Sequence, residues 1–375
     1  MTDTPRYDVI VLGGGPAGCA AAMTLVRHGF AVTVLERARH DSFRVGETLA
    51  PRTQLLLENL GAWEALQASG PIPSPGVVSL WGSADPYEHD FLGGIYDTGW
   101  HVDRAQFDAL LVRSGEQLGV YFVRCTSSTQ CRHDEAGVWT VAIHRAGELV
   151  QIQGRFLIDA TGRAAWLATR QGAKRRPVDQ LVGVAGMAVA ADSGPWEDQD
   201  RRLLVEAVED GWWYTSPMPG GPAIAVFLTD ADLLPKTELE RTTWWEAAIA
   251  QTTATRTRLR GTCWVEGIRV VQANCAGLDR VVGDDWLAVG DAAVAWDPLA
   301  GQGVYRALES GQHGGECAAA HLAGDRQALT HYITFAQRTW QSLLASRHQI
   351  YDQERRWSSS TFWKRRHSKP ADGLS

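Results

Sequence analysis

The stretch that decides the fold is Gly13-Gly14-Gly15-Pro16-Ala17-Gly18, which joins a short apolar run, Tyr7–Leu12, to a segment of helical character, Ala17–His28. A second apolar run, Ala31–Leu35, follows the helix and leads directly to Glu36. Buried strand, glycine turn, helix and buried strand in this order are typical of a βαβ unit. The beginning of the chain therefore predicts an α/β domain that binds a dinucleotide.

Each glycine of this turn has a separate purpose. Gly13 permits the tight turn, Gly15 lets the backbone approach a pyrophosphate, and Gly18 lets the helix pack on the sheet. Glu36 stands where an acidic residue accepts hydrogen bonds from an adenosine ribose. The motif alone does not distinguish NAD from FAD. The candidate dinucleotide-binding residues are Gly13, Gly15, Pro16, Ala17, Gly18, Glu36 and the adjacent Arg37.

The composition excludes several classes of protein. The chain has 375 residues, 45% of them hydrophobic and 21% charged, which suits a globular protein of about two domains. Its net charge of −7 gives no general attraction to nucleic acid. No run approaches the ~20 apolar residues that span a bilayer, and the start of the chain shows no signal peptide. Six cysteines without a CxxC pair indicate free thiols in a reducing cytoplasm. Tryptophan is unusually frequent, with 16 of the 33 aromatic residues.

The middle of the chain changes character. Alternating, Gly- and Pro-bounded segments predict strands at Val77–Trp81, Val138–His144, Leu181–Ala190, Leu203–Val208, Trp212–Pro217 and Ala223–Leu228. Helical spacing predicts helices at Arg52–Leu60, at Asp103–Leu118 with Asp103 as the N-cap, at Gly303–Leu322 and at Gln327–Arg356, and Trp286–Val289 is a further strand. We therefore expect a Rossmann-like domain with C-terminal helices, built from residues 1–75, 101–170 and 277–375. A mainly antiparallel, β-rich substrate domain, 76–100 and 171–276, is inserted in it, and Ser358–Ser375 is predicted to be a mobile basic tail.

A second motif extends the argument. Gly290-Asp291 follows the predicted strand at Trp286, and Asp297-Pro298-Leu-Ala300-Gly301-Gln302-Gly303 leads into the long helix. Here the sequence resembles the FAD-dependent hydroxylase superfamily, which includes p-hydroxybenzoate hydroxylase, the tryptophan halogenases and the geranylgeranyl reductases. The resemblance implies FAD and the p-hydroxybenzoate hydroxylase type of fold. It also implies that Asp291 binds the ribityl chain and that Pro298, Gly301, Gln302 and Gly303 lie at the flavin ring, with the helix N-terminus facing its N1–C2=O edge.

Three further segments carry the same resemblance, so that the matches span residues 7 to about 310. Val45-Gly46-Glu47-Thr48 resembles a loop that runs beside the flavin, and Val102-Asp103-Arg104 resembles a segment whose Arg reaches FAD. Phe156-Leu-Ile-Asp159-Ala-Thr-Gly162-Arg163 resembles the second glycine turn near the cofactor. The resemblance thus adds Arg44, Glu47, Thr48, Arg104, Asp159 and Gly162 to the candidate FAD-binding residues.

The departures from the halogenase pattern indicate which flavin chemistry to expect. Halogenases have D-P-L-E-S-T-G where this chain has Asp297 to Gly303, with Ala300 in place of the acid. Their relay lysine has no counterpart in Val77–Gly82, and W-x-W-x-I-P is only partly matched by Trp212–Pro217. We therefore expect hydroxylation with O2 through a flavin C4a-hydroperoxide rather than halogenation. NAD(P)H and a partner flavin reductase remain alternative electron sources.

Aromatic residues are expected to form the dry pocket that such chemistry needs. Alternation along a strand sends Trp212 and Tyr214 to one face. The segments predicted to converge on the pocket carry Trp81, Trp100, Trp212, Trp213, Tyr214 and Trp296, and the alternative for any single one of these tryptophans is a core residue of a β-sheet. The candidate catalytic residues are Glu47, Trp212, Tyr214 and Pro298, and His101 is a weaker candidate near the ring.

The substrate is inferred from the resemblance alone. Gly211-Trp-Trp-Tyr-x-x-Pro217 is similar to a short subgroup of halogenase-like flavoproteins, some of which are maturases that hydroxylate a tryptophan within a partner protein. This similarity implies an aromatic, indole-like substrate, either free or carried on a peptide or protein. The basic segment Arg355–Arg366 is either a docking patch for an acidic partner or a solvated tail. A halogenase-like or geranylgeranyl-reductase-like oxidoreductase of a natural-product pathway and a non-catalytic flavoprotein chaperone are the alternatives.

Overall fold

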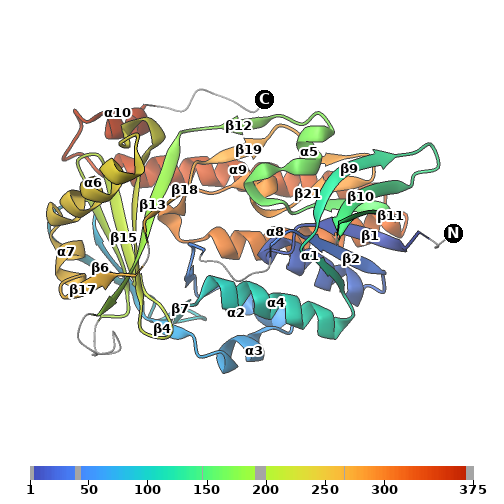
Figure 1. Ribbon diagram of the computed structural model, residues 1–375, viewed down its shortest axis with the longest axis horizontal. Helices are drawn as coiled ribbons and strands as arrows, with labels where there is room; N and C mark the ends of the chain where they lie inside the picture. The colour runs from blue at the N-terminus through green and yellow to red at the C-terminus, as the bar shows by residue number, and fades with distance from the viewer. Residues whose placement is uncertain (1–3, 39–43, 146, 191–199, 266, 369–375) are drawn as a thin grey trace.

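A computed structural model describes residues 4–38, 44–145, 147–190, 200–265 and 267–368. In Figure 1 two large sheets stand side by side, the first on the right near the N-terminus and the second on the left. The long helix α8 (Gly303–Leu322) runs through the middle of the molecule between them. The predicted combination of an α/β layer and a mainly antiparallel sheet is confirmed.

The first sheet contains the glycine-turn motif. Its strand order is β20-β21-β11-β1-β2-β8, with β10 and β9 continuing beyond β11. The pairs β1–β2, β1–β11, β11–β21 and β2–β8 are parallel, as expected for strands joined by helical crossovers. The strands are β1 (Arg6–Leu12), β2 (Val32–Glu36), β8 (Tyr121–Arg124), β9 (Ser127–His133), β10 (Trp139–Arg145), β11 (Glu148–Asp159), β20 (Val282–Gly283) and β21 (Trp286–Ala288).

Helices from both ends of the chain cover this sheet. Helix α1 (Pro16–Arg27) packs against α8, and a Cβ added at Gly311 would lie 2.3 Å from the carbonyl oxygen of Ala17. This close crossing places the beginning of α1 against the middle of α8, although some 290 residues separate the starts of the two helices. The other helices near this sheet are α2 (Thr53–Asn59), α3 (Trp63–Ala68), α4 (Arg104–Leu118), α5 (Trp166–Arg170) and α9 (Ala328–Asp352). Asp103 caps α4 as predicted, since its side chain accepts from the Gln106 amide.

The second sheet has the order β17-β13-β16-β15-β14-β5-β6, and β18 also pairs with β13. All its pairs are antiparallel except β14–β5. The strands are β5 (Gly76–Leu80), β6 (Tyr87–Asp90), β13 (Leu181–Ala190), β14 (Leu203–Val208), β15 (Gly211–Pro217), β16 (Ala223–Asp230), β17 (Thr262–Trp264) and β18 (Arg269–Gln272). Two small sheets join the layers, namely β3 (Thr48–Leu49), β7 (Gly99–His101) and β4 (Ile72–Ser74), and β12 (Arg175–Pro177), β19 (Ala276–Leu278) and β22 (Val294–Ala295).

The two faces of the second sheet pack against different partners. Helices α6 (Glu238–Ala250) and α7 (Ala254–Arg258) cover the outer face, where Trp213 contacts Trp245. The inner face holds Trp212 and packs against the C-terminal part of the chain. Because neighbouring residues of a strand point to opposite faces, two adjacent tryptophans serve two separate cores.

The end of the chain differs from the prediction. We expected a mobile tail from Ser358, but Thr361–His367 forms helix α10, and Phe362 and Trp363 are fully buried. Helix α9 ends at Asp352, four residues before the predicted boundary. Apolar residues among the basic ones explain the difference, since the aromatic side chains gain more from burial than a solvated tail would offer. Of the predicted tail, residues 369–375 lie outside the described part of the chain. Within the described part, no helix is both long and apolar enough to cross a membrane.

Candidate functional site

A cavity of about 320 Å³ lies where the two layers meet. One end is formed by the beginning of α1 and by the loop before α8, and the other end by the inner face of the second sheet. Its lining brings together residues that the sequence placed in separate motifs, namely Gly15, Pro16, Ala17, Glu47, Thr48, Arg104, Gly162, Trp212, Tyr214, Asp291, Pro298, Gly301 and Gly303. Gly13, Gly18, Glu36, Arg37, Arg44, Asp159 and Gln302 do not line it.

The glycine turn is built as the motif requires. Gly13 has φ +106°, and a Cβ there would lie 2.3 Å from the Ala160 carbonyl oxygen. A Cβ at Gly18 would lie 1.9 Å from the Gly13 carbonyl oxygen, so this position also accepts glycine alone. At Gly15 the space is open, since a Cβ would meet no atom within 4 Å. No side chain caps α1, and its first amide groups therefore face a space that can receive an anion.

Glu36 lies at the end of β2, beside the turn. Its carboxylate accepts hydrogen bonds from the amides of Gly14 and Ala38, both at 2.5 Å. The acid is therefore oriented by backbone groups beside the cavity, while the next residue, Arg37, is exposed. Asp159 is fully buried and accepts from the Thr161 and Ala168 amides at 3.0 and 2.9 Å, so it supports the second glycine turn from behind.

Asp291 faces the cavity from the short 3₁₀ helix η4 (Gly290–Ala292). Its carboxylate lies 3.4 Å from the Arg163 guanidinium. Burial raises the pKa of Asp291, and the charges of Arg163 and Arg175 act in the opposite direction. Arg163 belongs to the segment that resembles the second glycine turn, but no role was predicted for its side chain. The glycine spacing carried the prediction there, and no pattern pointed to a charged partner for Asp291.

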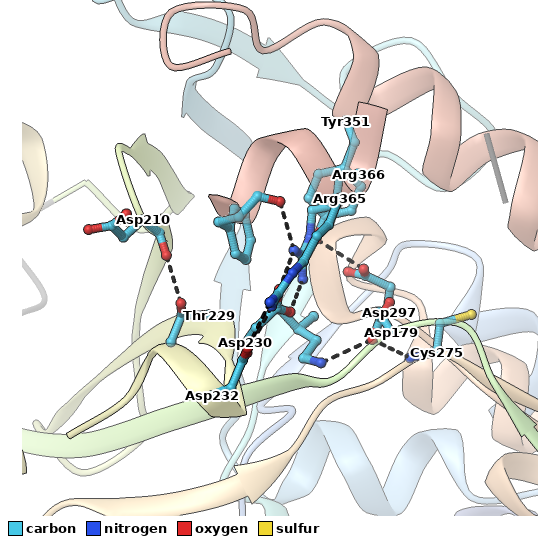
Figure 2. Close-up of polar contacts among 12 residues, drawn as sticks. Asp179, Asp210, Thr229, Asp230, Asp232, Cys275, Asp297, Tyr351, Arg365 and Arg366 are labelled. Carbon is cyan, nitrogen blue, oxygen red and sulfur yellow. Dashed lines mark hydrogen bonds and ion pairs between the residues drawn. The ribbon is translucent and has the colours of Figure 1, made fainter. Parts of the chain in front are cut away.

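A buried acid, Asp297, fixes the loop before α8. Asp297 caps the 3₁₀ helix η5 (Pro298–Ala300) by accepting from the Leu299 amide at 3.0 Å. Its other oxygen accepts from the Tyr351 hydroxyl at 3.0 Å and from Arg347 at 3.3 Å. Figure 2 shows Asp297 next to Asp179, which in turn binds Arg347 at 2.7 Å. Helix α9 thereby holds the loop that carries Pro298.

The loop of Glu47 forms another wall of the cavity. Glu47 is 1% exposed and accepts from the Ser216 hydroxyl at 2.6 Å and from the Gly46 amide at 3.0 Å. Burial raises its pKa. Arg104 donates to the Val45 carbonyl at 2.9 Å, which ties the loop to α4. Arg104 and Arg44 both bind the buried Asp108, at 3.2 and 2.8 Å, so Arg44 supports α4 behind the cavity.

The second sheet supplies an aromatic wall. Trp212 and Tyr214 line the cavity from β15, and Ser216 continues the same face to reach Glu47. Burial and the nearby Glu47 carboxylate raise the pKa of the Tyr214 hydroxyl well above its usual value. The hydroxyl therefore stays protonated and can donate a hydrogen bond into the cavity. Ser216 was not predicted, although the alternation that selected Trp212 and Tyr214 also includes it.

Not all of the predicted tryptophans reach the cavity. Trp296 lines it, but Trp213 points to the outer face, and Trp100 packs on Trp63 with ring centroids 5.6 Å apart. Trp81 lies behind Trp212, at 6.1 Å. The predicted convergence of these six aromatic residues is thus wrong for Trp81, Trp100 and Trp213, because strand alternation and the layer boundary direct their side chains elsewhere.

Two other expectations concern single polar residues. His101 is buried outside the cavity, where its Nε2 donates to the Arg201 carbonyl at 2.7 Å and its Nδ1 accepts from Thr48 at 3.0 Å. Burial lowers its pKa to about 4, so it is neutral at physiological pH. The basic segment near the C-terminus is not a free patch. Arg366 and Arg365 bind Asp230 at 2.7 and 2.9 Å, as Figure 2 shows.

The cavity lining contains arginines but no lysine among the described residues. The chain has four lysines. Lys174, Lys236 and Lys364 are exposed, and Lys369 lies outside the described residues. The described part of the chain also has no group of three His, Cys, Asp or Glu side chains that could hold a metal ion.

Comparison with known proteins identifies the family. The model of the FAD binding domain family matches residues 6–341, which is most of the chain. The LodB protein of Marinomonas mediterranea, named as an FAD-dependent oxidoreductase, is 30% identical over 372 residues, covering 96% of this chain and 97% of LodB. A tryptophan 2-halogenase of Chondromyces crocatus is 28% identical over 89% of this chain, which spans 65% of that halogenase.

Solved structures have the same fold. The flavin-dependent halogenase CmlS matches with a TM-score of 0.87 at 24% identity, over 99% of this chain and 69% of CmlS. The peptidyl tryptophan dihydroxylase QhpG matches with a TM-score of 0.77 at 24% identity, over 98% of this chain and 80% of QhpG. At this identity the likeness concerns the fold, which is that of the flavin-dependent hydroxylases and halogenases. The chain belongs to the FAD binding domain family and is a flavin-dependent enzyme.

The residues of the cavity fit FAD. The open space at Gly15 recurs at Gly162, Gly301 and Gly303, where an added Cβ would again meet nothing within 4 Å. Gly162 and Gly301 have φ values of +65° and +59°, which favour glycine by themselves. Gly15 and Gly303 have neither a positive φ nor a neighbouring atom that requires glycine, as expected where a ligand approaches the backbone. The uncapped starts of α1 and α8 offer amide groups to anionic groups, and the Asp291 carboxylate offers an acceptor to hydroxyls.

Proposed function

We propose that this member of the FAD binding domain family is a monooxygenase that hydroxylates an aromatic, indole-like group, free or carried on a peptide or protein. One observation carries the proposal. One end of the cavity is lined by Gly15, Gly162, Gly301 and Gly303, which we call the glycine cradle. The other end is an apolar wall with Trp212 and Tyr214, and no described lysine lines the cavity. An oxidant formed in such a cavity meets the aromatic substrate directly, without an amine to relay it.

The residues around the cradle would hold the cofactor. Gly13, Gly15 and Gly18 shape the turn at which α1 would receive the pyrophosphate, and Glu36 and Asp291 would accept hydrogen bonds from the ribose and ribityl hydroxyls. Reduced flavin supplies the activation of O2. Beside it, Arg163 balances the charge of Asp291 at 3.4 Å. The other members of the proposed set are Pro16, Ala17, Thr48, Arg104, Gly162, Pro298, Gly301 and Gly303 in the cavity lining, and Arg37, Arg44, Asp159 and Gln302, which do not line it.

The wall on β15 would bind the substrate. The Trp212 ring offers a flat apolar surface, and the Tyr214 hydroxyl keeps its proton and can donate to a polar atom on the ring that is being oxidised. Leu203, Val205 and Val226 complete an apolar surface that excludes water. Glu47 holds its loop through Ser216 and Gly46, which positions the cavity wall rather than supplying a nucleophile.

The nature of two relatives supports the substrate class. One structural neighbour is named as a peptidyl tryptophan dihydroxylase, and one sequence relative as a tryptophan 2-halogenase. Both names contain tryptophan, and the wall of Trp212 suits an indole ring. Halogenation is less well supported than hydroxylation, because the chain has Ala300 where the halogenase motif has an acid and because no described lysine lines the cavity.

The test supplies all reactants and asks what is added to the substrate. The FAD-loaded enzyme is incubated with ¹⁸O2, NADH and a generic flavin reductase, together with free tryptophan or a tryptophan-containing peptide, with and without bromide. We expect a product that contains one or more ¹⁸O atoms, and the same product when bromide is present. A brominated product, or turnover that needs no O2, would refute hydroxylation. A parallel reaction without the reductase shows whether NADH reduces the flavin directly.

A further inference from the structure

A file of aromatic rings leads from the cavity to the surface. Trp212 lines the cavity, and its ring centroid lies 6.1 Å from that of Trp81. Trp81 lies 5.3 Å from Trp363, which lies 6.3 Å from Trp357. Trp212 and Trp363 are fully buried, whereas Trp81 and Trp357 are partly exposed. Four tryptophans from three distant segments of the sequence thus form one continuous path.

Tyr351 stands beside this path and has a proton acceptor. Its ring lies 5.7 Å from Trp81 and 6.1 Å from Trp363. Its hydroxyl receives a hydrogen bond from the Trp212 indole at 3.1 Å and donates to the Asp297 carboxylate at 3.0 Å. A tyrosine that loses an electron also loses its phenolic proton. The Asp297 carboxylate, 3.0 Å from the Tyr351 hydroxyl, is placed to accept that proton.

We infer that Trp212, Tyr351, Trp81, Trp363 and Trp357 form an electron-transfer chain that carries an oxidising equivalent from the cavity to the surface when no substrate consumes it. The rate of electron transfer falls steeply with distance. Electrons therefore pass between aromatic rings that are in contact much faster than between rings that are far apart. The inference rests on the proposed O2 chemistry for its physiological oxidant. Its role would be to spare the cavity wall from permanent oxidation.

The electrons balance along the path. The peroxide-level oxidant of the proposed O2 chemistry takes electrons from Trp212 one at a time, and Trp212 regains each of them from Tyr351 or Trp81. When Tyr351 is the donor, its phenolic proton moves to the Asp297 carboxylate and returns when Tyr351 is reduced again. Trp363 and then Trp357 supply the next electron. A small thiol in solution reduces the oxidised Trp357 and releases its own proton. Two such passages oxidise two thiols to one disulfide and deliver two electrons, which with two protons reduce the peroxide-level oxidant to a hydroxyl group and water.

The second sheet contains its own control for this inference. On the outer face Trp213, Trp245 and Trp264 are packed just as closely, with centroids 4.7 and 5.6 Å apart. None of these three lines the cavity. If the inner file were only core packing, the two clusters would behave alike towards an oxidant in the cavity.

The test uses light, which makes oxidised flavin a one-electron oxidant without O2. The FAD-loaded protein is excited by a laser flash under anaerobic conditions, and tyrosine and tryptophan radicals are followed by transient absorption. In the wild type we expect a tyrosyl radical and a longer-lived tryptophan radical. Tyr351→Phe should abolish the tyrosyl signal, and Trp81→Phe should reduce the long-lived tryptophan signal severalfold. Trp245→Phe should change neither signal. Identical traces for all four proteins would overturn the inference.

Two additions keep the result interpretable. Trp357→Phe, at a partly exposed position, should shorten the last radical without affecting folding, and an unchanged lifetime would exclude Trp357 as the exit. In a separate aerobic experiment, the flavin is reduced in air without substrate and oxidised residues are mapped by mass spectrometry. Oxidation at Trp357 in the wild type and at Trp212 in Trp81→Phe supports the inference. Normal flash signals with no oxidised residue would support the chain but contradict the O2 chemistry proposed above.

Discussion

Replacing Arg366 by Met tests whether the C-terminal helix is part of the folded core. The side chains of Arg366 and Asp230 are 1% and 2% exposed and join through two hydrogen bonds, at 2.7 and 3.1 Å. Arg365 binds the same carboxylate at 2.9 Å, but its side chain is 42% exposed and also binds Asp232. Two adjacent arginines therefore share one acid, one inside the protein and one at its surface.

The magnitude follows from this difference in burial. Removing one partner of a buried ion pair costs about 3–5 kcal/mol, because the other charge stays buried without its partner. Arg365 still reaches Asp230 in Arg366→Met, so we expect a loss near the lower limit, about 3 kcal/mol in the free energy of unfolding. Arg365→Met removes an exposed pair and should cost about 1 kcal/mol or less.

The assay is urea unfolding of the FAD-loaded protein, followed by tryptophan fluorescence and by flavin release. In a double-mutant cycle, Asp230→Asn combined with Arg366→Met should recover part of the loss, because no buried charge is left unpaired. Equal effects of the two single arginine substitutions, or a loss below about 1 kcal/mol in Arg366→Met, would refute the view that α10 is docked.

Three further predictions concern the cavity. Trp212→Ala or Tyr214→Ala should lower product formation while FAD stays bound, which absorbance of the purified protein and turnover measure together; loss of the flavin would contradict a substrate-side role. Gly18→Ala should destabilise the fold by about 1–3 kcal/mol or more, because its Cβ would lie 1.9 Å from a carbonyl oxygen. Gly15→Ala should leave the free energy of unfolding unchanged but weaken FAD binding about tenfold or more, which is about 1.4 kcal/mol. If Gly18→Ala and Gly15→Ala have equal unfolding curves and equal FAD affinities, FAD does not approach the backbone at Gly15. Glu47 has a raised pKa in the folded state, so the wild type loses stability as the pH rises through it. Glu47→Gln should lack this loss, and parallel stability–pH curves would show that the carboxylate does not titrate in this way.

The sequence predicted the FAD end of the site well, because that end depends on local chemistry. Only glycine fits a position with φ +106°, or a position where a Cβ would overlap a carbonyl oxygen. Such a requirement can therefore be recognised from a single residue of the sequence. The strands and helices around Gly13–Gly18 and Gly303 match the observed ones within one residue at nearly every boundary. Alternation in β15 likewise selected Trp212 and Tyr214 for one face.

The errors arose where a residue's partner is far away in the sequence. The segment Arg355–Arg366 has the composition of a solvated tail, yet Arg366 meets Asp230 across 136 residues. Neither segment by itself predicts that the two will pair, because a run of charged residues and an aspartate at the end of a strand are both common features. The pairing of Arg163 with Asp291 was not predicted for the same reason, because the two residues are far apart in the sequence.

The 16 tryptophans show the division most clearly. The sequence by itself determined the βαβ unit, the FAD cradle and the two faces of β15, because backbone conformation and strand period are local properties. Only the tertiary structure decided that Trp212 faces the cavity, that Trp213 belongs to another core, and that Trp81 and Trp363 join Trp212 to the surface. The physical reason is that burial and ring contacts depend on which layers meet, and that is settled by packing over the whole chain.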